Sequence, residues 1–198
     1  MPAGIVPAVL VRRVNRVRER MSKADPSEAV LDDLFVLWRA LEATFDRQRL
    51  RGVQRDQALS TVVDTIGYHG IASLPRIGKF VRELRVFETA SPDQIAEWFA
   101  TEEAANTTLK SRIVSQIALL RQAIAPPVRW SNHDSKKLGD LLYRTRCAVI
   151  HPTLDTNNSL VLQVLPALRD ALIELIIARV AQQSGLTLAE AGKAFDYA

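Results

Sequence analysis

The sequence predicts an all-α protein: an antiparallel helical bundle with a basic helix at its N-terminus and additional short helices inserted in its middle. Apolar residues recur at intervals of three and four along almost the whole chain, as they do on the buried face of an amphipathic helix. No stretch alternates apolar and polar residues as a half-buried strand would. Most of the eight glycines and nine prolines fall between the periodic segments, where they end helices.

Composition indicates one globular domain with its own core. Of the 198 residues, 47% are hydrophobic and 24% are charged, which is ordinary for a folded protein and excludes a disordered tail. No run of about 18 uncharged apolar residues is present, so we expect no membrane span and no membrane partner. The N-terminal MPAGIVPAVLVRR places its charges after the apolar residues, unlike a secretory signal. The single cysteine, Cys147, favours a cytoplasmic location.

Helical periodicity and turn residues place the expected helices in order. We expect helices over residues 5–21, 26–48, 55–66, 75–84, 92–99, 106–124, 134–150 and 160–183. Two patterns mark helix starts, Asp25-Pro26-Ser27-Glu28 and Ser91-Pro92-Asp93-Gln94. Each has a capping residue, a proline at the first helical position and an acceptor side chain at the third. Gly67 and Gly70 are expected to stop the helix over 55–66.

These helices divide the chain into three parts. They are a basic N-terminal helix over residues 1–24, a helical bundle over 25–185 and a C-terminal tail over 186–198. The stretch at about 52–105 has shorter elements and more turn signals, so we interpret it as an insertion into the bundle. The helix over 160–183 has the longest apolar stripe, and Pro166 either kinks it or lies in its first turn.

Positive charge is concentrated at the N-terminus. Residues 1–24 contain six basic residues and one acidic residue, a net charge of +5, whereas the whole chain carries +4. Arg12, Arg13 and Arg16 are therefore candidates for binding a polyanion such as nucleic acid. The alternative is a solvated helix face without a partner, and both interpretations stay open.

Several classes of catalytic site are excluded by the residues present. The three histidines, His69, His133 and His151, are not paired at helical metal-ligand spacing and no cysteine cluster exists, so no metal site is expected. The glycines form neither a phosphate-binding loop nor a dinucleotide fingerprint, so no cofactor is expected either. No serine lies in a nucleophile-elbow pattern.

One segment gathers charged and titratable side chains at the end of a predicted helix: LLYRTRCAVIHP, residues 141–152. His151 precedes Pro152 and so lies at the helix C-terminus, where the helix dipole favours a protonated imidazole. A histidine can move a proton on or off a ribose oxygen, and an arginine can hold a phosphoryl group. The structural alternative is that the arginines and the histidine only stabilise the end of this helix.

The spacing within this segment constrains how its side chains can meet. On an unbroken helix Arg144 and His151 lie within about 20° of one face, whereas Arg146 and His151 diverge by about 140°. Arg146 and His151 therefore converge only if the helix ends before His151 or if a second copy of the chain supplies the partner side chain.

This segment, with the polar turn and long apolar helix that follow it, resembles the HEPN superfamily of small helical-bundle domains. These domains are found in toxins, phage-defence proteins and RNA-processing factors, and their signature is an arginine followed by a histidine after four to six intervening residues. Arg146 and His151 have four residues between them, and Arg144 and His151 have six. Tyr143, three residues before Arg146, is also similar to what the family has at this place. The resemblance is specific over about residues 134–184 and absent from the N-terminal helix and the insertion.

The resemblance implies a metal-independent endoribonuclease, a toxin or defence effector, that cuts RNA as a homodimer. The ribose 2′-hydroxyl would attack the adjacent phosphate in a cleft lined by both copies. If the roles in the family apply to the matching positions here, His151 is the acid/base residue, Arg146 binds the phosphate and Arg144 supports Arg146. An antitoxin or another defence-system protein is the further partner that the resemblance implies.

Two alternatives stay open beside this interpretation. In the family the residue after the arginine is commonly asparagine, aspartate or histidine, whereas here it is Cys147, a weak hydrogen-bond donor. That departure favours a non-catalytic HEPN-like module that binds RNA, a nucleotide or a partner protein. A DNA-binding helix-turn-helix over residues 91–117 is the third interpretation, although the glycine expected in its turn is missing.

Overall fold

The computed structural model describes residues 6–21, 26–44, 55–99, 107–125, 129–150 and 159–196. Within these ranges the chain is almost entirely helical and contains no strand, which confirms the predicted all-α class. The α-helices are α1 (Ala8–Met21), α2 (Pro26–Glu42), α3 (Arg55–His69), α4 (Pro75–Glu83), α5 (Pro92–Phe99), α6 (Thr107–Ile124), α7 (Asn132–Ile150), α8 (Ser159–Ser184) and α9 (Leu188–Asp196). Two 3₁₀ helices, η2 (Ile71–Ser73) and η3 (Leu84–Glu88), flank α4.

Several helices begin where the sequence signals predict. At the start of α5, the Gln94 backbone N–H donates to Ser91 Oγ (3.2 Å), and the Ser91 N–H donates to Gln94 Oε1 (2.9 Å). This is the predicted capping box, which satisfies two backbone donors that the helix itself leaves free. Pro75 opens α4 as expected. The other predicted box lies outside the residues whose side chains the structure describes.

Two helix boundaries differ from the prediction, and the position of Pro166 decides between the two alternatives that the sequence left open. Helix α3 continues through Gly67 and ends before Gly70, whose φ of 77° is a left-handed conformation that glycine adopts readily. Helix α2 ends at Glu42 and not near Gln48. Pro166 lies inside α8, away from its first turn, and removes one hydrogen bond from the helical ladder because it has no N–H.

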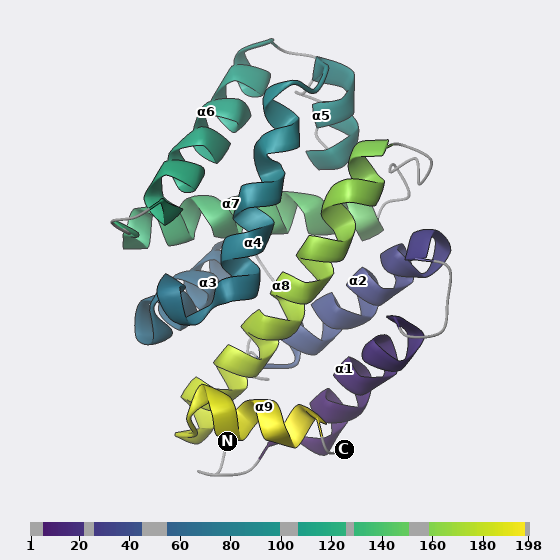
Figure 1. Cartoon of the computed structure of the whole chain (residues 1–198), viewed down its shortest axis with the longest axis vertical. Coiled ribbons are helices and arrows are strands. Elements are labelled where there is room, and N and C mark those ends of the chain that lie inside the picture. Colours follow the sequence, from purple (N-terminus) through teal and green to yellow (C-terminus); the bar gives the residue numbers. More distant parts are fainter. Residues whose placement is uncertain are drawn as a thin grey trace.

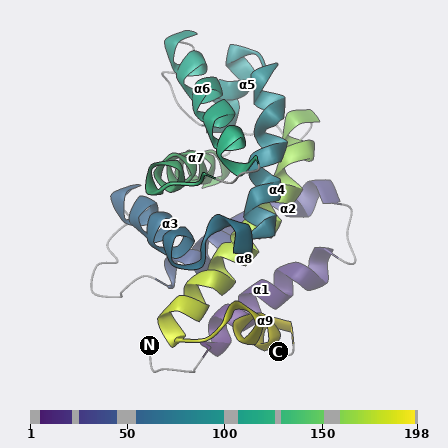
Figure 2. The ribbon, with the colours of Figure 1, turned by 60° about the vertical axis from the view of Figure 1, so that its left-hand side comes forward.

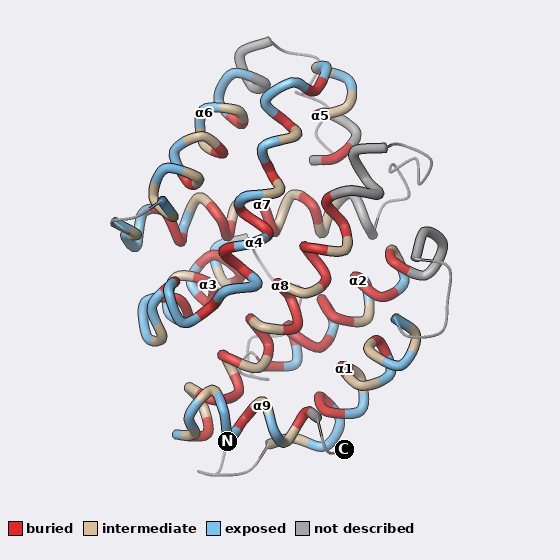
Figure 3. The backbone as a smooth tube through the Cα atoms, in the orientation of Figure 1, coloured by how far each residue is buried: buried red, intermediate tan, exposed pale blue. Residues whose placement is uncertain are grey.

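Helix α8 lies at the centre of the fold (Figure 1). Its side chains are buried on nearly all sides from Val164 to Ala181, and Figure 3 shows this burial along most of its length. Helices α2, α3, α4 and α9 pack against it. Helix α7 runs across the long axis of the molecule and packs on α2, α3, α5 and α6. None of the helices in the described ranges combines the length and the apolar content that crossing a membrane requires.

The segment interpreted as an insertion is part of this core. Helix α3 packs extensively along α7, and α4 packs extensively along α8. Ile66, Leu74 and Phe80 from this segment are buried in the same apolar cluster as the centre of α8. The apolar faces of these short helices therefore complete the burial of the two long helices.

Residues beyond 185, expected to be a tail, contain α9. Its Ala191 and Phe195 are fully buried, and α9 packs on α8 and on α1. Both views of the ribbon place α1 and α9 together at one end of the molecule (Figure 2). The two ends of the chain thus close one end of the core around α8.

The basic helix α1 is docked and is not a free arm. Its Leu10, Val14 and Val17 are buried, and it packs on α2. Arg20 of α1 lies 2.5 Å from the buried Asp33 of α2, and Arg169 of α8 lies 3.8 Å from the same carboxylate. Burial raises the pKa of Asp33 against the opposing attraction of the two guanidinium groups. This buried triad links α1, α2 and α8.

The N-terminus of α7 is fixed by a capping box that was not among the predicted helix starts. The Asp134 backbone N–H donates to Ser131 Oγ (3.2 Å), and Asp134 Oδ2 accepts the Ser131 N–H (3.0 Å) and hydroxyl (2.6 Å). Burial would raise the pKa of Asp134, but these hydrogen bonds and the Lys137 ammonium outweigh it, so the pKa lies below its usual value.

We predict that Asp134→Asn lowers the free energy of unfolding by about 1 kcal/mol at neutral pH. Because folding lowers the pKa of Asp134, its contribution is present above the pKa of an unfolded aspartate and is lost as the pH falls through the folded value. The difference between the wild type and the variant should therefore shrink below about pH 4 in urea-unfolding curves. Asp56→Asn, the same change at an exposed first-turn position of α3, is the control. A difference that stays constant to about pH 2 would contradict this account.

Candidate functional site

The two motif arginines, both on α7, point to different sides of the helix. They are two positions apart, which separates their directions by about 200°. Arg144 Nε lies 3.2 Å from Asp140 Oδ2, one turn earlier on the same helix. Arg146 reaches across to α2, where its Nη2 lies 3.7 Å from Glu42 Oε1. The structure therefore does not bring the two guanidinium groups together within one chain.

Glu42 is the centre of a group of side chains that holds Arg146, and we call Trp38, Arg39, Glu42 and Arg146 the Glu42 cluster. Glu42 is only 7% exposed. Its Oε1 accepts a hydrogen bond from the Trp38 indole N–H (2.9 Å), and its Oε2 accepts one from Arg39 Nη1 (3.0 Å). Two arginines thus compensate one buried negative charge, and the indole restricts where that carboxylate can lie.

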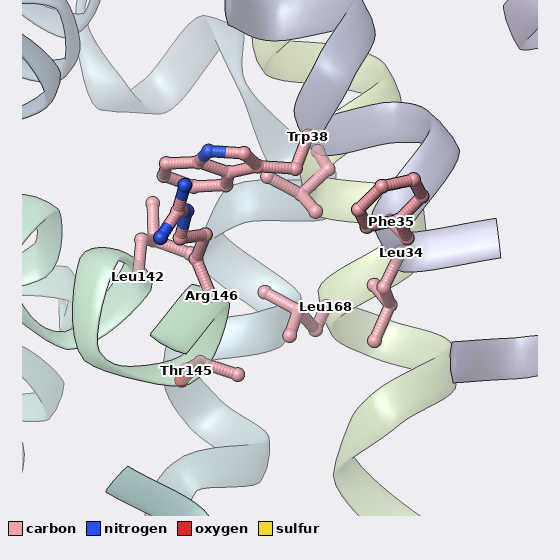
Figure 4. Close-up of a pocket in the computed structure, with 8 residues that line it drawn as sticks. Leu34, Phe35, Trp38, Leu142, Thr145, Arg146 and Leu168 are labelled. Atoms are coloured by element: carbon pink, nitrogen blue, oxygen red, sulfur yellow. The ribbon is translucent and has the colours of Figure 1, made fainter. Parts of the chain in front are cut away.

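The Arg146 side chain borders a small apolar pocket (Figure 4). The pocket is lined by Leu34, Phe35, Trp38, Leu142, Thr145, Arg146, Leu168 and Leu172. Its free volume of about 10 Å³ admits a single water and no larger ligand. Arg146 has a 22% exposed side chain, and Phe35 is 45% exposed. The guanidinium is therefore held at the edge of the core with one part open to solvent.

His151 and Pro152 lie outside the described residues, directly after the last residue of α7. The meeting of Arg146 and His151 therefore stays a prediction. Cys147, next to Arg146, is half-buried and is a free thiol. Nothing in the described part of α7 interrupts the helix before Ile150, so any change of direction that brings His151 toward Arg146 comes after that residue.

The three N-terminal arginine candidates lie in different surroundings on α1. Arg12 and Arg16 are exposed. Arg13 is half-buried, and its Nη1 donates to the backbone carbonyl of Arg39 (3.1 Å). Because Arg39 also belongs to the Glu42 cluster, Arg13 connects the basic helix to the surroundings of Arg146.

Sequence reasoning missed Glu42 and Arg39 as parts of the site. A signal was present, because Glu42 follows Trp38 by four positions in a predicted helix, so the two side chains share a face. A glutamate on the apolar face of a helix needs a partner. That pattern did not indicate that the partner would be Arg146, from a distant part of the chain.

The described ranges contain no group of three or more His, Cys, Asp or Glu side chains that could hold a metal ion. Comparison of the chain with protein-family models, with curated proteins and with solved structures finds no match.

We predict that Glu42→Ala lowers the free energy of unfolding by about 3 kcal/mol, because it leaves the Trp38 N–H without its acceptor and Arg146 without its counter-charge. Arg39→Ala is the matched control, because it removes the Arg39–Glu42 ion pair by truncating Arg39, whose side chain is 60% exposed. It should change the free energy of unfolding by less than about 1 kcal/mol. Equal losses in the two variants, measured by urea unfolding, would show that Glu42 has no role beyond that surface ion pair.

Proposed function

We propose that this chain is a metal-independent endoribonuclease of HEPN type that acts on RNA as a homodimer. The observation that carries the proposal is the position of Arg146, whose guanidinium lies 3.7 Å from the buried Glu42 at the edge of the core and which His151 follows in the same segment. An arginine that is already ordered can receive a phosphate with little further loss of side-chain entropy. In this proposal α7 and α8 are the antiparallel helix pair of a HEPN-like bundle.

Dimerisation would solve the geometric problem that the two arginines present. Because Arg144 and Arg146 point to different sides of α7, one chain offers only part of a cleft lined by arginine and histidine. If two copies of α7 met near their C-termini, His151 of one chain would lie opposite Arg146 of the other. The half-buried Cys147 lies close to that expected contact.

The proposed reaction is an internal transfer that needs no metal ion. His151 of one copy takes the proton of the ribose 2′-hydroxyl, and the 2′-oxygen forms a bond to the adjacent phosphorus. The bond from phosphorus to the 5′-oxygen breaks, and that oxygen receives a proton from the second imidazole. Arg146 stabilises the negative charge that develops on the phosphoryl oxygens, and Arg144 supports Arg146 in this role. The products are a 2′,3′-cyclic phosphate and a 5′-hydroxyl.

This chemistry fits a toxin or a defence effector, because unrestricted RNA cleavage harms the cell that performs it. The same argument makes an antitoxin or another defence-system protein the expected protein partner. A cytoplasmic location, where RNA is available and a free thiol stays reduced, agrees with the single cysteine.

We expect His151→Ala to reduce cleavage of a fluorescent RNA oligonucleotide at least about 100-fold, with wild-type cleavage unaffected by EDTA. His69→Gln is the control, because glutamine can keep the hydrogen bond that His69 Nε2 makes to the Ala178 carbonyl (2.7 Å). Both variants should have the same melting temperature as the wild type, measured by circular dichroism. If the purified wild type cuts no RNA, or if His151→Ala cuts equally well, the nuclease proposal fails.

A second candidate function is a non-catalytic HEPN-like module that binds RNA. It is favoured by the Arg146–Glu42 ion pair, which gives the arginine a counter-charge without a phosphate, and by the two exposed arginines on α1. Such a module would bind RNA without cutting it, and His151→Ala would leave its affinity unchanged.

For either function, we predict that the double variant Arg12→Gln/Arg16→Gln weakens RNA binding about tenfold. It should also reduce the salt slope of the binding constant by about 1 to 2, because each arginine that is removed leaves one phosphate without its counter-charge. The control Lys79→Gln/Arg85→Gln removes two exposed charges from α4 and η3 and should have a smaller effect. Fluorescence anisotropy at several salt concentrations measures both quantities. If the two double variants behave alike, α1 is a solvated face with no specific role.

A further inference from the structure

A second and much larger cavity, of about 450 Å³, opens between α3, α6 and α7. Both views of the ribbon place α7 between the other two helices (Figure 2). The volume lies within the range of pockets that bind small molecules. It is separate from the pocket beside Arg146, which is lined by other residues.

The rim of this cavity has an excess of positive charge. Lys137 lies 3.2 Å from Asp134, and Asp140, the carboxylate among the described lining residues, lies 3.2 Å from Arg144, so these charges are compensated within α7. Arg112 on α6 and Lys136 on α7 are exposed and form no ion pair with the described residues.

Two other titratable groups lie near this opening in the part of the chain that the structure describes. His133, in the first turn of α7, also lines the cavity and is exposed. Asp56 on α3 lies in an adjoining hollow of about 330 Å³ that shares Leu59 and Lys136 with the cavity. Arg112 and Lys136, two cations from different helices that pair with no described residue, lie around one opening and favour an anion with at least two charged oxygens, such as a phosphate monoester.

The rest of the lining suits a flat, partly apolar ring. Leu59 and Leu119 provide apolar surface, and Leu119 is 48% exposed although it is a large hydrophobic residue. The Gln116 amide N–H donates to the Lys137 carbonyl (2.8 Å), which fixes the amide and leaves its oxygen to accept. Ser115 adds a hydroxyl on the same helix. An amide oxygen and a hydroxyl can pair with the exocyclic amine of a heterocycle.

We propose that this cavity is a nucleotide-binding site. Arg112 and Lys136 hold the phosphate, Leu119 and Leu59 pack against the base, and Gln116 accepts from the base amine. The same chemistry is offered by a free nucleotide and by one unit of an RNA strand. The site goes beyond the proposed nuclease function, because it uses none of the residues placed in catalysis.

Isothermal titration of the full chain with adenosine 5′-monophosphate and with a short oligoadenylate tests the proposal. Arg112→Gln and Lys136→Gln should each weaken binding about tenfold, because each removes one charged contact to the phosphate. Lys193→Gln, which removes one exposed charge from α9, is the control and should leave binding unchanged. If the two cavity variants weaken binding of the mononucleotide, the ligand of the cavity is a free nucleotide; if they weaken binding of the oligonucleotide and the mononucleotide does not bind, the ligand is one unit of a strand.

Two results would overturn the site: no binding of either probe at about 1 mM, or equal weakening by Lys193→Gln and by the two cavity variants. The result is independent of the proposed nuclease function. His151→Ala should bind both probes as the wild type does, so a failure of cleavage and a failure of nucleotide binding are seen in separate measurements. Circular dichroism melts of the cavity variants should match the wild type, because the substituted side chains are exposed.

Discussion

The burial of α8 on nearly all of its sides is the constraint on which the rest of the structure depends. A helix that is apolar all round cannot lie on a surface, so it needs neighbours in every direction. Helices α2, α3, α4 and α9 provide them, and α1 closes the end with α9. Two charged residues of α8 that are withdrawn from water both find partners on neighbouring helices. Arg169 lies beside Asp33, and Glu174 accepts the backbone N–H of Ile77 (2.8 Å) near the start of α4.

Burial of charge, more than burial of apolar surface, fixes the surroundings of Arg146. Apolar burial between α7 and α2 is non-directional, so by itself it does not orient the Arg146 side chain. The Glu42 carboxylate has direction: one oxygen accepts from Trp38 and faces Arg146, and the other accepts from Arg39. Removing the carboxylate leaves the buried Trp38 N–H without its acceptor and the largely buried Arg146 without its counter-charge. This network sets the register between α2 and α7, and with it the direction of the motif arginine.

The two proposed sites differ in how the chain prepares its charges. At the Glu42 cluster the guanidinium is already paired, so an incoming phosphate has to compete with a carboxylate of the same chain. At the cavity between α3, α6 and α7, the acidic residue is paired elsewhere and the two outer cations are not paired with any described residue. The cavity is therefore the better anion receptor in one isolated chain, whereas the Arg146 site depends on a second copy. Asp140 and Arg144 connect the two, because Asp140 lines the cavity and Arg144 belongs to the motif.

Local signals in the sequence determined the helical class, most helix boundaries and the candidate segment on α7. Capping residues, prolines and apolar spacing act within a few positions of one another. For this reason Ser91 and Pro75 predict helix starts, and the apolar spacing of α8 predicts a helix, without knowledge of the fold. Only the tertiary structure decided that α3 and α4 belong to the core, that α9 is a docked helix and that Arg146 is held by Glu42. It also decided that Arg112 and Lys136 share one opening. These features pair residues that are far apart in the chain, and helical spacing fixes the face of a side chain but not which helix packs against that face.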